Sequence, residues 1–233
     1  MEISKRMIGS IFIFTLILTH AFTAQSQTPP SPDEISAYTG NLEAAANNDE
    51  EKIKMLAAKG KKPESRDGHG RTPLHVAVFR GHHEAMRALV EAGANPNALE
   101  NDRYDIVTIA AVDNDIPTLK LALELGASAK NITSPYDGTA LIAAAHLGHV
   151  EVVQILIEAG APLDHVNNLG WTALIESIVL GDGGPRHTET LKALVAAGAD
   201  VNISDNSGAS PLSLASSRGY QEMVDILEAS MMR

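Results

Sequence analysis

Hydrophobic and polar positions follow a pattern along this chain that repeats as units with two helical segments each. A short apolar run, a break, a longer amphipathic run and a second break make up one unit, and the clearest units begin 33, 34, 33 and 38 residues apart. In the longer runs the apolar residues recur at helical spacing, which predicts one buried face on each second helix. The residues that mark this face are Leu89, Val90, Leu123, Ile155, Leu156, Leu194, Val195, Ile226 and Leu227.

The breaks contain residues that tolerate a left-handed backbone. Glycine follows the second helical run in five units, where a residue with positive φ commonly ends a helix. Glycine or asparagine fills the break between the two runs of every unit, and asparagine is the side chain that best tolerates positive φ. These positions are Gly60, Gly93, Gly126, Gly160 and Gly198 after the second runs, and Asn48, Gly81, Asn114, Gly148, Gly181 and Gly219 between the runs.

The unit from Asp67 to Asn97 carries the most distinctive motif. It contains the phrase Thr72-Pro73-Leu74-His75-Val76-Ala77, followed by Gly81-His82 and Gly93-Ala94. This unit resembles the ankyrin repeat, and related phrases begin in register at Asp105, Thr139, Thr172 and Ser210. The resemblance implies an all-α ankyrin-repeat solenoid of about six helix-turn-helix units joined by β-hairpin or loop fingers. The expected repeat domain, residues 37–233, divides into units at 37–66, 67–99, 100–133, 134–166, 167–204 and 205–233.

The first 26 residues differ in composition from the repeats. Lys5-Arg6 precede an apolar stretch from Ile8 to about Phe22, and Ala24-Gln25-Ser26 place small residues before Gln27. This pattern is typical of a secretory signal peptide cleaved near Ser26-Gln27, and an uncleaved membrane anchor is the alternative. Residues 27–36 are then expected to form a Pro-rich extended linker. The chain has no cysteine, so a lipoprotein anchor is excluded, and the periplasm of a Gram-negative bacterium is the expected compartment.

Charge narrows the class of partner. The chain has 18 Lys and Arg against 29 Asp and Glu, a formal net charge of −11, which disfavours nucleic acid and anionic lipid. We expect no stable membrane insertion after cleavage of the leader. The first and last units have polar ends, which favours a monomer over end-to-end stacking.

No catalytic, cofactor-binding or metal-binding motif stands out. His82-His83-Glu84 and His146-Leu147-Gly148-His149 could suggest a metal site, but His75, His82 and His149 fill positions that are structural in the repeat that this chain resembles. Gly181-Asp182-Gly183-Gly184 matches neither a phosphate-binding loop nor a dinucleotide fingerprint. We therefore expect neither an enzyme nor a cofactor.

Candidate partner-binding residues follow from the register of the repeat. In ankyrin-like units, the finger tips and the ends of the first helices line the concave face, and aromatic and arginine side chains there are typical of interaction sites. The finger-tip candidates are His69, Arg71, Tyr104, Tyr136 and Trp171. The candidates at the ends of the first helices are Phe79, Arg80, Val112, Asp113, His146, Leu147 and Leu180.

The fifth unit contains an insertion. Thr172 and Gly198 are 26 residues apart, against 21 for the matching positions of other units, and the extra residues fall within 181–187. We expect a surface loop between two helices there.

Together these features predict an exported, periplasmic protein-protein interaction module that binds one protein partner in its concave groove without catalysis. Two alternatives remain open. One is a secreted effector that binds a host protein, and the other is an immunity or accessory protein for an envelope enzyme or toxin.

Overall fold

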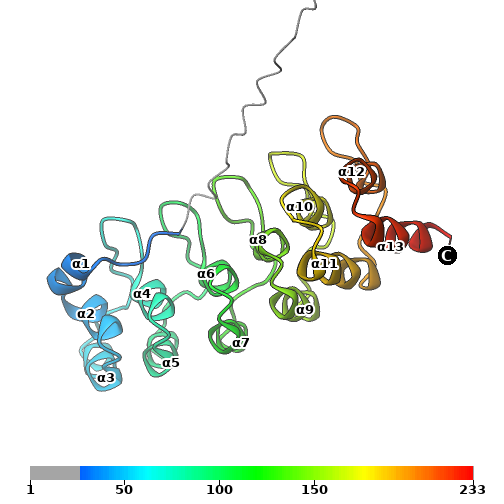
Figure 1. The fold of residues 1–233 in the computed structure, drawn as a ribbon. Helices are drawn as coiled ribbons and strands as arrows, with labels where there is room; N and C mark the ends of the chain where they lie inside the picture. The colour runs from blue at the N-terminus through cyan, green and yellow to red at the C-terminus, as the bar shows by residue number, and fades with distance from the viewer. Residues whose placement is uncertain (1–26, 233) are drawn as a thin grey trace, which may run out of the picture.

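The computed structural model describes residues 27–232, and this part of the chain folds into helices that stack as pairs (Figure 1). A short helix at the N-terminal end precedes six pairs, which confirms the predicted all-α repeat solenoid. The helices are α1 (Pro32–Ala37), α2 (Gly40–Ala46), α3 (Glu50–Ala58), α4 (Pro73–Phe79), α5 (His83–Glu91), α6 (Ile106–Val112), α7 (Ile116–Glu124), α8 (Ala140–Leu147), α9 (Val150–Glu158), α10 (Ala173–Val179), α11 (Pro185–Ala196), α12 (Pro211–Arg218) and α13 (Gln221–Met231).

The pairs form two rows of helices. The first helices of the pairs, α2, α4, α6, α8, α10 and α12, make one row, and the second helices make the other (Figure 1). Small buried alanines such as Ala77, Ala110 and Ala144 let neighbouring helices approach closely, and larger residues such as Leu141 and Leu174 fill the space between pairs. The result is one continuous core along the stack, as the apolar periodicity predicts.

Side-chain caps explain where the first helices begin. In every first helix except α2, the hydroxyl or carboxylate of the N-cap residue accepts a hydrogen bond from the backbone N–H three residues later, which satisfies a donor that the helix leaves free. Thr72 and His75 form a reciprocal capping box in α4, and Pro73 and Pro211 occupy first-turn positions. The N-caps that act in this way are Thr72, Asp105, Thr139, Thr172 and Ser210.

The predicted left-handed positions are confirmed with one exception. The glycines that follow the second helices all have positive φ, and Asn48 and Asn114 adopt φ of 52° and 54° between helices. The exception is Gly181, for which the left-handed residue is Gly183 at φ 69°. The insertion moves the turn two residues along the chain, so the sequence register placed it too early.

The insertion is partly helical and makes a hydrogen bond to the last repeat, unlike a simple surface loop. Pro185–His187 form the first turn of α11, which has 12 residues where α9 has 9. The Tyr220 hydroxyl donates to the Gly181 carbonyl at 3.1 Å, which ties the loop to the last repeat. The expectation of a simple loop across 181–187 is therefore wrong for its second half.

The fingers between repeats are loops. Within residues 27–232 no strand forms, and an isolated antiparallel bridge joins Thr133 to Gly138. Backbone hydrogen bonds link neighbouring fingers, from Asn101 N–H to the His69 carbonyl at 3.0 Å and from Asn168 N–H to the Tyr136 carbonyl at 2.9 Å, and the Asn206 side chain links the last finger to the Leu169 carbonyl. Loop fingers, not β-hairpins, are thus the form that this chain takes.

The segment expected to be an extended linker is partly helical and packs on the repeats. Ser31 caps α1, so residues 32–36 are helix, and residues 27–31 have no regular secondary structure. The predicted signal peptide, residues 1–26, lies outside the described residues. In the part of the chain that is described, no helix is long and apolar enough to span a membrane.

Candidate functional site

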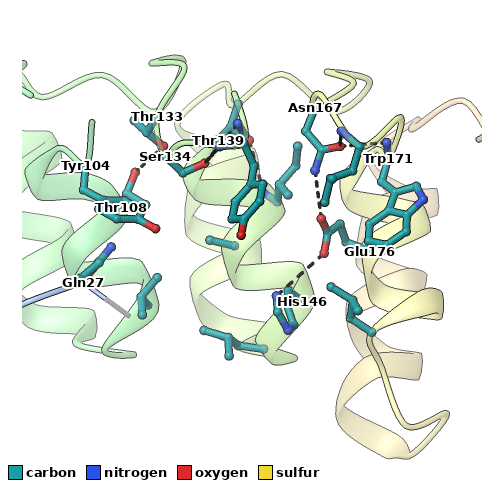
Figure 2. A pocket seen from close by; sticks show the side chains of 18 residues that line it. Gln27, Tyr104, Thr108, Thr133, Ser134, Thr139, His146, Asn167, Trp171 and Glu176 are labelled. Carbon is teal, nitrogen blue, oxygen red and sulfur yellow. Dashed lines mark hydrogen bonds and ion pairs between the residues drawn. The ribbon is translucent and has the colours of Figure 1, made fainter. Parts of the chain in front are cut away.

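The stack curves so that the first helices and the fingers lie on its inner side (Figure 1). This side holds a cavity of about 300 Å³. Three neighbouring repeats build it: α6, α8 and α10 provide the floor, and the fingers before them provide the upper wall. We call this space the concave cavity. Its lining is mainly apolar, with a few polar groups pointing inward (Figure 2).

Seven of the twelve predicted binding residues line the concave cavity. They come from finger tips and from the ends of first helices, as the repeat register predicts, and the fold brings together positions up to 76 residues apart in sequence. Large side chains of this kind at a hollow surface favour partner binding. The seven are Tyr104, Val112, Tyr136, His146, Leu147, Trp171 and Leu180.

Four other predicted residues lie at the surface outside the concave cavity. His69 is exposed on its finger tip, 3.5 Å from a carboxylate oxygen of Glu34. Arg80 and Asp113 are exposed after α4 and α6, and Phe79 is half-buried against the core. These residues extend the inner side beyond the cavity without contributing to its lining.

Arg71 has a different place from the one predicted. Its side chain is 1% exposed, and its Nε donates to Asp67 Oδ2 at 2.6 Å. Its other nitrogens donate to a Glu34 carboxylate oxygen and, at 2.7 Å, to the Thr28 carbonyl. Arg71 therefore fixes α1 and the N-terminal segment to the repeats, and the expectation that it contacts a partner is wrong because no part of it is free.

The most distinctive polar group of the cavity is Glu176, which the binding candidates did not include. It lies in α10, and its Oε1 accepts from Asn167 Nδ2 at 3.0 Å, while Oε2 lies 3.8 Å from His146 Nδ1 (Figure 2). Burial raises the pKa of Glu176 to about 7, against the lowering effect of Asn167. Burial also lowers the pKa of His146, with a further contribution from His187. The available sequence signal was a lone carboxylate inside the apolar run Ala173–Val179.

Gln27 occupies the other end of the concave cavity. Its side chain lies near Tyr104 and Thr108, away from Glu176 (Figure 2). The residue is 9% exposed, and both polar atoms of its carboxamide are buried without a hydrogen-bond partner among residues 27–232. No periodicity marks this residue, because it precedes the first repeat.

The histidines that could suggest a metal site serve as links between repeats. His82 Nδ1 lies 2.9 Å from the Ala45 carbonyl, and His149 Nδ1 lies 3.0 Å from the Ala111 carbonyl, so each joins its turn to the preceding first helix. His187 does the same with the His146 carbonyl at 2.9 Å. The structural role predicted for His82 and His149 is confirmed. Residues 27–232 contain no group of three or more side chains suited to a metal ion.

Comparison with known proteins agrees with the architecture. A family model described as ankyrin repeats (3 copies) matches residues 42–133 and 107–205. The putative ankyrin repeat protein YahD of Escherichia coli K12 is 30% identical over 190 residues, which cover 81% of this chain and 94% of YahD. The mouse B-cell lymphoma 3 protein homolog is 33% identical over 68% of this chain, which spans 35% of that protein.

Solved structures show the same fold. An ankyrin repeat domain from Acinetobacter baumannii AYE is 40% identical, with a TM-score of 0.76 over 82% of this chain and 97% of that one. The ankyrin repeat domain of Bcl-3 is 28% identical, with a TM-score of 0.73 over 83% of this chain and 86% of that one. Domains of this family generally mediate protein-protein interactions and are typically non-catalytic. From its repeat motif, its stacked helix pairs and these matches, the chain belongs to the ankyrin repeat family.

Proposed function

We propose that this chain is an exported protein-binding module that captures one protein partner in the concave cavity, without catalysis. The observation that carries the proposal is the cavity itself, a hollow of about 300 Å³ with Tyr104, Tyr136 and Trp171 in its lining. Aromatic side chains at a concave surface supply most of the binding energy in many interfaces, because they bury a large area with little loss of conformational freedom.

The binding experiment compares three forms of the protein as bait in an envelope fraction, with partners identified by mass spectrometry. Trp171→Ala removes a cavity wall, whereas Met55→Ala removes an apolar side chain that is 46% exposed on α3, outside the cavity. We expect one protein to be captured by the wild type and by Met55→Ala and lost from Trp171→Ala, with circular dichroism showing that each form is folded. Equal capture by all three would rule out the concave cavity as the binding site.

The exported location is proposed from the N-terminal sequence. Lys5-Arg6, the apolar stretch after them and the small residues before Gln27 have the organisation of a cleavable signal. Cell fractionation followed by N-terminal sequencing tests it: we expect the protein in the periplasmic fraction with Gln27 as its first residue or blocked at that position. An intact Met1 in the cytoplasm would contradict export, and an intact Met1 in the membrane fraction would favour the anchor.

A further inference from the structure

Glu176 is a buried carboxylate that has no lysine or arginine partner among the described residues. Its side chain is 6% exposed, and it accepts one hydrogen bond, from the neutral amide of Asn167. His146 is too distant at 3.8 Å for a hydrogen bond, and within residues 27–232 no lysine or arginine lies within ion-pair distance of Glu176. Since burying an uncompensated charge is costly, this carboxylate has an unmet need for a positive partner.

The surroundings of Glu176 suit the two parts of a basic side chain. Trp171 and Tyr136 share the cavity lining with it (Figure 2). Aromatic rings attract cations through the negative potential of their faces. Ile142, Leu147 and Leu180 provide apolar wall, along which the methylene groups of lysine or arginine can pack while the charged end reaches a carboxylate.

At the other end of the cavity, the segment that begins at Gln27 contributes one side chain to the lining. Residues 27–31 have no regular secondary structure, and the Gln27 side chain is buried there although, within the described part of the chain, neither polar atom of its carboxamide has a hydrogen-bond partner. A buried amide without partners is unfavourable, so this end of the site has polar capacity that a ligand could satisfy. The cavity therefore extends from an amide at one end to a carboxylate at the other.

We infer that the concave cavity receives the side chain of a lysine or arginine carried on an extended segment of the protein partner, with Glu176 as the counter-ion. The inference rests on the proposed function and specifies the chemistry of its contact. The cavity lining contains acidic Glu176 and no lysine or arginine, and the whole chain has a net charge of −11, so a basic segment is also favoured at longer range.

A peptide library tests this chemistry directly. The probe is a mixture of N-acetylated, C-amidated nonapeptides whose central residue is lysine, arginine, glutamine, leucine or glutamate in equal amounts, with random flanks. Immobilised full-chain protein retains peptides at pH 8, and mass spectrometry identifies the central residues. We expect lysine and arginine to be enriched about tenfold over leucine and glutamate, as a desolvated cation–π and carboxylate contact would require.

Two variants locate the effect. Glu176→Gln removes the charge but retains an oxygen that can accept from Asn167, so the fold is preserved, and Glu158→Gln removes an exposed charge on α9 as the matched control. We expect Glu176→Gln to lose the basic preference and Glu158→Gln to keep it. Trp171 is the single tryptophan of the chain, so its fluorescence reports whether a retained lysine peptide sits in the cavity.

Several results would overturn the inference. They are retention without a basic preference, a basic preference that Glu176→Gln leaves intact, no retention of any peptide, or retained peptides that leave Trp171 fluorescence unchanged. The proposed function is tested separately by capture of the folded partner. A partner lost from Trp171→Ala but captured equally by Glu176→Gln would keep the binding module and reject its charge chemistry.

Discussion

At the scale of single residues, burial changes what two charged side chains do. The repeat register directs Arg71 toward the inner surface, and Glu176 lies in the apolar run of a first helix; the structure buries both side chains. Arg71 has acidic partners, whereas Glu176 has one neutral donor and no cation among the described residues. Arg71 therefore stabilises the fold, whereas the burial of an ionised Glu176 destabilises it.

The cost at Glu176 predicts a pH-dependent stability. Its pKa is about 7 in the folded protein against 4.5 as the reference, so the folded state binds the proton more tightly. The contribution of Glu176 to the free energy of unfolding therefore falls as the pH rises from 4.5 to 7. The free energy of unfolding of Glu176→Gln minus that of the wild type should therefore be about 2 kcal/mol larger at pH 8 than at pH 5.

Urea denaturation of both proteins at the two pH values measures this difference. His75, whose pKa burial lowers to about 4, titrates in both proteins, so its effect cancels in the comparison. A stability difference between Glu176→Gln and wild type that is the same at both pH values would contradict the raised pKa.

Substitution of Arg71 should destabilise the fold, whereas substitution of Glu176 should stabilise it at high pH. Arg71→Met leaves the Asp67 carboxylate, whose side chain is 5% exposed, without its cation, and it frees the Thr28 carbonyl. We expect the free energy of unfolding to fall by about 3 kcal/mol, because breaking a buried ion pair strands the other charge. Arg87→Met is the control, since Arg87 is 61% exposed and pairs with Glu124 at 3.8 Å, and its effect should stay within about 0.5 kcal/mol. An equal decrease in the free energy of unfolding for both variants would contradict a stabilising role for the buried ion pair of Arg71.

At the scale of helices and turns, the fifth repeat departs from its neighbours. Three anchors hold its insertion: the early start of α11, the hydrogen bond from Tyr220 to Gly181, and the link from His187 to the His146 carbonyl. Tyr220 occupies the N-cap of α13, where other repeats have His82 or His149, and it reaches the preceding repeat in the same way. The longer turn of the fifth repeat is thus contacted by a tyrosine, Tyr220, at the position where other repeats use a histidine.

The turn at Gly183 should tolerate no side chain. Its φ is 69°, and a Cβ there would lie 2.3 Å from Tyr220 Cδ1. We expect Gly183→Ala to lower the free energy of unfolding by about 2 kcal/mol through backbone strain and overlap. Gly208→Ala isolates the backbone part, because Gly208 has φ 81° with open space around it, and should cost about 1 kcal/mol. Thermal melts of both variants and of Gly68→Ala, which has neither constraint, make the comparison; equal melting temperatures for Gly183→Ala and Gly68→Ala would contradict it.

At the scale of the whole molecule, each helix pair packs mainly on its neighbours in the stack. Stability in such a solenoid is close to a sum of terms between adjacent repeats. The concave cavity spans three repeats, α6 to α10, so its shape depends on how these repeats stack and on no single repeat alone. A binding site that crosses repeat boundaries explains why its members lie about one repeat length apart in sequence.

The closed ends of the stack predict a monomer. The helix α1 lies beside α2 at the N-terminal end of the stack (Figure 1), and α13, at the other end, has exposed polar residues and the exposed Met231 and Met232. Because few large apolar side chains are exposed at the two ends of residues 27–232, sedimentation equilibrium should give the mass of one chain at two protein concentrations. A mass that rises toward that of two chains would contradict the prediction.

The sequence by itself determined the period, the helix pairs and most of the left-handed turns, because these express local backbone needs at fixed spacing. For that reason the sequence predicted the positive φ of Asn48 and Asn114 and the helix caps at Thr72 and Ser210. The same register brought seven candidates to the lining of the concave cavity.

Only the tertiary structure decided which inward-facing residues are free. Arg71 donates hydrogen bonds to Thr28, 43 residues earlier, and to Glu34, 37 residues earlier. Gln27 lines a cavity whose walls belong to the third, fourth and fifth repeats. Glu176 owes its raised pKa to burial between α8 and α10. Burial and charge neutralisation are sums over contacts between segments far apart in the chain, and a local pattern of residue types does not contain them.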